Sequence, residues 1–180
     1  MPKLKPRLWL LALLVLCLPQ AACSNDDATD DPPENSDPDN NQALGFEASF
    51  ADDRPDFDAK SYSAVRNTLT NTFVVGGSEK AFGDEDGRRI DITLVDGFTG
   101  EPASWNAAED ILEIEFEDEN GENDREYTSV SATLTVTDVT TEDDKTKVSG
   151  SFTATLEHED GEQIEITAGS FSRITLQEVP

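Results

Sequence analysis

Hydrophobic and polar residues alternate along most of the chain after residue 44. This period of two predicts β-strands with one buried face and one solvent-exposed face, as antiparallel sheets allow. Weaker strand candidates bring the expected number of strands to about eight. The clearest alternations cover residues 90–94, 112–117, 130–136, 152–156 and 164–168, and the weaker ones cover 46–50, 57–65 and 69–75.

Turn residues separate these alternations. Asp86-Gly87, Asn120-Gly121 and Asp160-Gly161 each lie between two hydrophobic segments. Such pairs readily adopt the positive φ angles that hairpin turns require. The last pair therefore predicts a hairpin between residues 145–156 and 162–176.

The fold class follows from these strands and from the lack of long amphipathic helices. Residues 102–110 predict at most one or two helical turns, so parallel βαβ units are excluded. Residues 45–180 are long enough for one all-β domain that buries roughly two-thirds of its unfolded surface. Its strands either pack as a single antiparallel β-sandwich or curl into a partly closed β-barrel, with a lipocalin-like barrel as the alternative.

Residues 1–22 predict an export signal. Three basic residues precede an apolar run at residues 8–18, and Ala21 and Ala22 follow it. This run is too short for a permanent transmembrane helix, which needs about 20 residues. A signal peptide is the better interpretation. Because Cys17 lies inside the apolar run, the mature chain keeps Cys23 alone and forms no internal disulfide.

The segment Gln20-Ala21-Ala22-Cys23 resembles the lipobox of bacterial lipoproteins. The resemblance implies that the Cys23 thiol is diacylated, that the signal is cut before it, and that the new N-terminus is acylated. Several acyl chains anchor a protein stably, whereas one holds it only marginally. The alternative is ordinary cleavage near Ala22, which would release a secreted protein with an exposed thiol.

Residues 23–44 predict a disordered linker between this anchor and the β-domain. The segment carries seven acidic residues, three prolines and no aromatic residue, so it cannot bury enough apolar area to fold. Charge repulsion and proline keep it extended. Ser24 after the cysteine resembles lipoproteins sorted to the outer membrane of Gram-negative bacteria, on either the periplasmic or the surface face.

The net charge limits the partners. Three of the 13 basic residues precede Cys23 and all 39 acidic residues follow it, so the mature chain carries ten bases against 39 acids, a charge of −29. Such a surface repels nucleic acid and anionic lipid headgroups, so membrane attachment has to be covalent. The charge also suits a saline exterior, because salt screens the self-repulsion of the domain.

Clusters of oxygen ligands make calcium the one metal worth considering, since Ca²⁺ prefers carboxylates and carbonyls. No cluster matches an EF-hand loop, and solvated turns in an acidic protein are the alternative explanation. No other cofactor is expected. The candidate ligands are Asp52, Asp53, Asp56 and Asp58 in one group and Asp118, Asn120, Glu122 and Asp124 in another.

Catalysis is poorly supported, and we expect no enzyme. The single histidine, His158, lies in a predicted hairpin turn flanked by acidic residues, whereas a catalytic base has to be held by packing. No Gly-x-Ser-x-Gly motif occurs. With 39 acidic residues, a pair of carboxylates at glycosidase spacing is expected by chance and carries no signal.

Ligand binding rests on one aromatic residue. Trp105 lies in a predicted connection rather than in a strand, which makes it a candidate contact for a ligand or glycan. Filling a β core is the alternative role for the aromatic residues. Residues 148–152 and 166–171 resemble strands of small β-rich lipoproteins of Gram-negative bacteria, a resemblance that implies a fold and no activity.

Together these observations predict a monomeric, non-enzymatic envelope lipoprotein with a binding or structural role. Its partner would be a glycan, a small ligand or an envelope protein. One alternative is a lipocalin-like carrier of a small apolar ligand, which needs a cavity of about 300 Å³ or more. The other alternative is a calcium-dependent adhesion or glycan-binding module.

Overall fold

The structure is a computed structural model that describes residues 44–80, 87–107, 111–119 and 124–180. The chain divides into two units, Met1–Ser36 and Asp37–Pro180, and every described residue belongs to the second. The predicted signal peptide, Cys23 and nearly all of the predicted linker therefore lie outside the described residues. No helix in the described part of the chain is long and apolar enough to span a bilayer.

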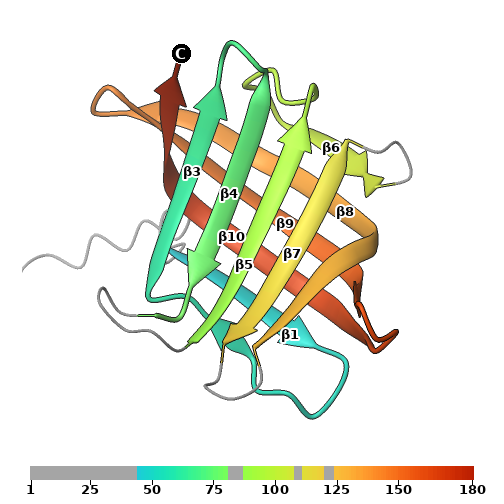
Figure 1. Ribbon diagram of the computed structural model, residues 1–180. Coiled ribbons are helices and arrows are strands. Elements are labelled where there is room, and N and C mark those ends of the chain that lie inside the picture. The colour runs from blue at the N-terminus through green and yellow to red at the C-terminus, as the bar shows by residue number, and fades with distance from the viewer. Residues whose placement is uncertain (1–43, 81–86, 108–110, 120–123) are drawn as a thin grey trace, which may run out of the picture. The chain divides into compact units, whose positions relative to one another are not determined.

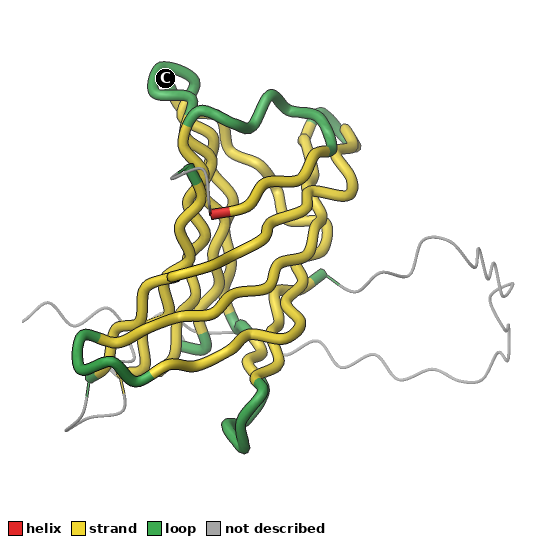
Figure 2. Tube along the Cα trace, turned by 90° about the vertical axis from the view of Figure 1, so that its right-hand side faces the viewer, coloured by secondary structure: helices red, strands yellow, loops and turns green. Residues whose placement is uncertain are grey.

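The described residues form ten strands and almost no helix (Figures 1 and 2). The strands are β1 (Gly45–Phe50), β2 (Phe57–Asp58), β3 (Ser61–Asn67), β4 (Thr72–Ser78), β5 (Gly87–Val95), β6 (Ala103–Asn106), β7 (Leu112–Glu119), β8 (Arg125–Glu142), β9 (Lys145–His158) and β10 (Gln163–Val179). The strands β1, β5 and β7 lie close to predicted alternations, because their alternating residues have one face to bury, whereas β8 extends well beyond the predicted residues 130–136 at both ends.

Seven strands close into a barrel in the order β3-β4-β5-β7-β8-β9-β10. Neighbours are antiparallel except where β10 returns to β3, and this parallel pair closes the barrel from Leu176 opposite Ala64 to Val179 opposite Asn67. In Figure 1, β3, β4, β5 and β7 form the near wall and the long strands β8 to β10 pass behind them. The all-β prediction is confirmed, and the barrel is the alternative that the chain adopts.

Two long strands each pair with two successive partners along one edge. β8 pairs with β7 near its start and with β6 further on, and β10 pairs first with β1 and then with β3. Register shifts interrupt β8 between Val136 and Asp138 and β10 between Phe171 and Ile174. Such bulges bend a strand locally, which lets these long strands curve around the barrel.

The barrel interior is filled by side chains. The inward-facing positions of the strands form one continuous hydrophobic cluster. Aromatic rings are among its largest side chains, and several pack against each other, as with Phe73 and Phe98, whose ring centroids lie 4.4 Å apart. The largest fully buried aromatic side chains are Tyr127, Phe46, Phe57, Phe73, Phe98, Phe116, Phe152 and Phe171.

Two local predictions were wrong. Residues 103–106 form the strand β6 rather than a helical turn, because they pair with β8 residues 133–136. Residues 68–71 form the turn before β4 rather than part of a strand, and Leu69 is exposed. Asn71 has a positive φ of 51°, which an asparagine tolerates in a hairpin turn.

Close packing makes one glycine a sensitive test of the filled interior. A Cβ at Gly150 would overlap the Phe171 ring and the Thr135 carbonyl oxygen, whereas a Cβ at Gly45 would have no atom within 4 Å. We expect Gly150→Ala to destabilise the barrel by about 1–3 kcal/mol through overpacking. The control Gly45→Ala should stay within about 0.5 kcal/mol of the parent chain in urea denaturation. Equal stability of the two variants would contradict the tight packing.

Candidate functional site

One end of the barrel is closed by Arg54, from the connection between β1 and β2. Its guanidinium carbon lies 5.5 Å from the centroid of the Phe50 ring and 5.6 Å from those of Phe116 and Tyr127. The Asp52 carboxylate lies 3.4 Å from the guanidinium. At such distances a cation is attracted to the faces of aromatic rings, so Arg54 covers the aromatic core at this end.

Arg88 holds that connection in place. It follows the first residue of β5 and donates hydrogen bonds to the carbonyl oxygens of Pro55 at 2.6 Å and Asp56 at 2.7 Å. Its Nε donates to Glu79 Oε2 at 2.7 Å. The same guanidinium lies 5.8 Å from the Phe57 ring. Arg88 therefore joins the segment that carries Arg54 to the barrel wall.

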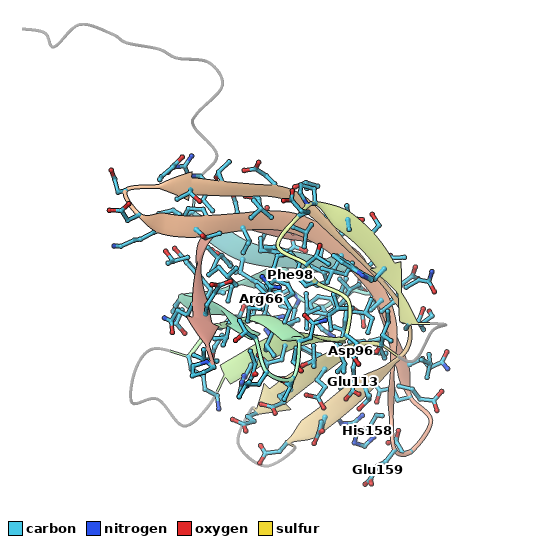
Figure 3. All side chains as sticks on the ribbon, turned by 90° about the horizontal axis from the view of Figure 1, so that it is seen from above. Arg66, Asp96, Phe98, Glu113, His158 and Glu159 are labelled. Carbon is cyan, nitrogen blue, oxygen red and sulfur yellow. The ribbon has the colours of Figure 1, made fainter. Side chains whose placement is uncertain are left out.

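A third arginine covers the core at the opposite end. Arg66, near the end of β3, lies 5.7 Å from the Phe98 ring and pairs with Glu178 at 3.3 Å. Figure 3 looks onto this end and shows Arg66 and Phe98 close together. The sequence carried a signal for two of these arginines, since Arg66 and Arg88 lie in phase with buried positions of their strands. Our sequence reasoning missed it.

Hollows in the structure lie on the surface of the barrel. Five of them have volumes between about 180 and 640 Å³, and exposed polar side chains line each one. A lipocalin-like carrier needs an interior space of about 300 Å³ or more, whereas the described interior is occupied by the hydrophobic cluster. The barrel fold by itself remains compatible with a lipocalin-like protein.

The first group of calcium candidates lies at the connection between β1 and β2. Asp52, Asp53 and Asp56 lie in the connection between β1 and β2, and Asp58 lies in β2. Asp52 is engaged by Arg54, whose backbone N–H donates to Asp52 Oδ1 at 3.1 Å.

The second group of calcium candidates is only partly described. Asp118 lies in β7 and Asp124 precedes β8, while Asn120 and Glu122 lie outside the described residues. Among the described residues, no group of three or more acidic, histidine or cysteine side chains is arranged to hold a metal ion.

Trp105 lies in β6 rather than in a connection, and it is partly buried. Its ring packs against the hydrophobic cluster and meets Phe98 edge to face at 6.3 Å. Gly97 lies against the indole, because a Cβ there would come within 2.7 Å of Trp105 Nε1. These contacts indicate a packing role for the Trp105 ring.

His158 is more enclosed than the hairpin pattern predicted. It ends β9, and its side chain is only 16% exposed. Its Nδ1 lies 3.0 Å from Asp160 Oδ1, and its ring lies 5.4 Å from the Tyr127 ring. Figure 3 shows His158 with Glu159 at the rim of the barrel. The sequence analysis expected a hairpin histidine that is not held by packing, and this was wrong because the ring packs against Tyr127.

Carboxylates gather on the outer face of β5, β7 and β8. Asp91 and Glu115 lie directly opposite each other in the β5–β7 pair. Burial raises the pKa of Asp91, although Arg89, at 2.6 Å, opposes the rise. Burial also raises the pKa of Glu115, with further contributions from Glu113 and Glu126. Like charges directly opposite each other in a sheet are destabilising. Ionisation of these carboxyl groups therefore lowers the stability of the folded state.

Glu115 makes that cost measurable. Its pKa is raised above the ordinary value of 4.5, so the folded state holds the proton more tightly than the unfolded state. Ionisation therefore lowers stability as the pH rises through this range, and the penalty is absent well below pH 4.5. We expect Glu115→Gln to raise the melting temperature at neutral pH and to have little effect in acid. The matched control, Glu165→Gln on β10, should not show this pH-dependent gain.

The excess of negative charge predicts a strong response to salt. Residues 45–180 carry 32 acidic and ten basic residues. Raising NaCl from about 0.1 M to about 1 M shortens the Debye length from roughly 10 Å to 3 Å and screens most of the repulsion. We expect the melting temperature to climb steeply over this range. A flat response would contradict salt adaptation, and a jump with micromolar Ca²⁺ alone would instead reveal specific calcium sites.

Comparison with known proteins assigns the chain to no family. No family model, no curated protein and no solved structure matches this chain. The structure therefore defines a fold class and no functional class. The fold is a closed β-barrel with extra strands, and side chains fill its interior.

Proposed function

We propose that the chain is a non-enzymatic, lipid-anchored envelope lipoprotein whose barrel binds its partner on the outer surface. The observation that carries the outer-surface part is the filled interior, which is covered by arginines at both ends. A molecule inside this barrel would have to displace buried aromatic side chains. The outer surface, by contrast, offers open hollows lined by polar side chains.

The anchor part of the proposal is supported by the sequence. A short basic and apolar leader ends in small residues, and a single cysteine at position 23 follows it. The acidic segment after Cys23 separates the cysteine from the first strand at Gly45. The negative charge disfavours electrostatic attachment to anionic lipids, which makes a covalent anchor the simplest means of retention. We propose the outer membrane of a Gram-negative bacterium as the location.

A lipocalin-like carrier is the second candidate, and the barrel fold is compatible with it. Carriers of this kind hold an apolar ligand inside the barrel, in a cavity wide enough for it. Here the ring centroid of Phe46 lies 5.4 Å from that of Phe152 and 6.4 Å from that of Phe171. Aromatic rings therefore occupy the interior, where the ligand of such a carrier would lie. We therefore rank the carrier below outer-surface binding.

Replacing Cys23 tests the anchor. We expect Cys23→Ser to abolish acylation and to move the protein from the membrane fraction to the soluble fraction, because the acyl chains supply the apolar contact with the bilayer. Intact-protein mass spectrometry should show the lipid on the parent chain only. The matched control is Cys17→Ser, which removes the other cysteine from the leader and should leave acylation and fractionation unchanged.

Two results would overturn the anchor. A parent chain whose Cys23 carries no lipid would do so, as would a Cys23→Ser variant that stays in the membrane fraction.

A further inference from the structure

Two valines on the near wall of the barrel in Figure 1 point outward, where an antiparallel sheet that faces water carries polar side chains. Val65 and Val74 lie directly opposite each other in the β3–β4 pair. The residues beside them, Ala64, Phe73 and Val75, are buried inside the barrel. Because side chains alternate along a strand, the two valines lie on the outer face, and both are partly exposed there.

Strand register extends this apolar surface across four strands. Two residues further along, one row on the same outer face runs through Val179 of β10, Asn67 of β3, Thr72 of β4 and Val95 of β5. Val95 is 43% exposed and Val179 is 36% exposed. At the usual spacing of strands, the row is about 15 Å wide. We call the four outward residues the valine face: Val65, Val74, Val95 and Val179.

The valine face lies in the part of the chain with the least negative charge. Residues 59–78, which include β3, β4 and the turn between them, contain no acidic residue, and this is the longest such stretch after Cys23. Acidic residues only border the face, since Glu113 lies opposite Thr93 on β7 and Asp96 follows Val95. Two copies of this acidic chain repel each other over most of their surfaces. Through the valine face they can approach with much less repulsion.

The pattern of the valine face is complementary to itself. One row reads Gln177, Val65, Val74, Thr93 across the four strands, and the next reads Val179, Asn67, Thr72, Val95. Each row has the same order of valine and polar residues from either side. A twofold axis parallel to the strands, between β3 and β4, therefore places valine against valine. Val65 would face Val74 of the second copy, and Val179 would face Val95 of the second copy.

A bilayer suits this face less well. Proteins that rest on a membrane surface typically place Trp or Tyr at the interface and Lys or Arg beside the headgroups. The polar positions in the two rows are occupied by Asn67, Thr72, Thr93 and Gln177, which are neither aromatic nor basic. A second copy, by contrast, offers a matching uncharged surface.

The outer face of β8 and β9 is also poor in charge, but it offers little to bury. Thr133 and Thr153 lie opposite each other there, and their hydroxyls share a hydrogen bond of 2.6 Å. The next pair on this face is Thr135 and Ser151. Removing hydroxyl groups from water gains little free energy, whereas removing valine side chains gains free energy in proportion to their apolar area.

We propose that the valine face is the contact between two copies of this chain in a twofold-symmetric dimer. Such a contact uses the same patch on both copies. The face is smaller than the interfaces of stable complexes, so we expect a weak dimer with a dissociation constant on the order of 10 μM. This inference replaces the monomer expected from the sequence. It goes beyond the proposed function and requires neither the lipid anchor nor a further partner.

The test is sedimentation equilibrium of the purified full chain carrying Cys23→Ser, so that no acyl chain contributes to association. We expect Val74→Glu to weaken the dimer at least about tenfold, because it places two like charges close to the twofold axis. The matched control is Thr153→Glu, which adds the same charge at an exposed outward position of β9. It should change the dissociation constant by less than about twofold, because its charge lies in solvent.

A second variant separates loss of the contact from loss of the fold. Val65→Thr with Val74→Thr keeps β-branched side chains of similar size and adds no charge, so we expect the barrel to fold while the dimer weakens about tenfold. Circular dichroism melting of each variant checks the fold. Raising NaCl to about 1 M should strengthen the parent dimer, because salt screens the remaining repulsion between the copies.

Several results would overturn the dimer. The inference is wrong if the parent chain stays monomeric well above the expected dissociation constant, if the double threonine variant associates like the parent, or if Thr153→Glu weakens association as much as Val74→Glu. A monomer that binds phosphatidylethanolamine and phosphatidylglycerol vesicles, and loses them with Val74→Glu, would assign the face to lipid instead. None of these results bears on the lipid at Cys23, which mass spectrometry detects separately.

Discussion

The contact between arginines and aromatic rings at the barrel ends is the interaction on which the other features depend. A closed barrel filled with phenylalanine would otherwise expose the last layer of rings to water at each end. Arg54 and Arg66 cover those rings, and each keeps one nitrogen buried without a hydrogen-bond partner, Nη1 in Arg54 and Nε in Arg66. A buried unpaired N–H is costly, so the attraction to ring faces and to nearby carboxylates such as Glu178 has to offset that cost.

Covering the ends has a consequence for function. The rings and the arginines occupy the interior and its openings, which is why the proposed binding site is on the outer surface. That surface carries charges that repel each other across strand pairs, as Asp91 and Glu115 do on β5 and β7. Burial and neighbouring charge raise the pKa of both carboxyl groups, so their ionisation reduces the stability of the barrel.

Sequence reasoning succeeded where one local rule decides the structure. The alternation at residues 90–94 and 112–117 predicted the buried faces of β5 and β7, because a strand that covers a core places a hydrophobic side chain at every second position. It failed at residues 102–110 and 69–75, where the intrinsic preference for helix or strand is weak and the secondary structure depends on a neighbouring strand. Ala103–Asn106 became a strand because β8 lies alongside it. The surface hollow of about 370 Å³ could not be foreseen either, since its lining residues Glu47, Thr137 and Ser170 come from segments far apart in the chain.

The sequence by itself determined the all-β class, the strong negative charge and the candidate anchor, because each depends on composition or on a pattern within a few neighbouring residues. The tertiary structure alone decided between sandwich and barrel through the parallel pairing of β10 with β3. It also decided which charged residues face inward over the rings and which meet on the outer surface. Those outcomes depend on strand order and register, and the pairing of segments more than a hundred residues apart leaves no local trace in the chain.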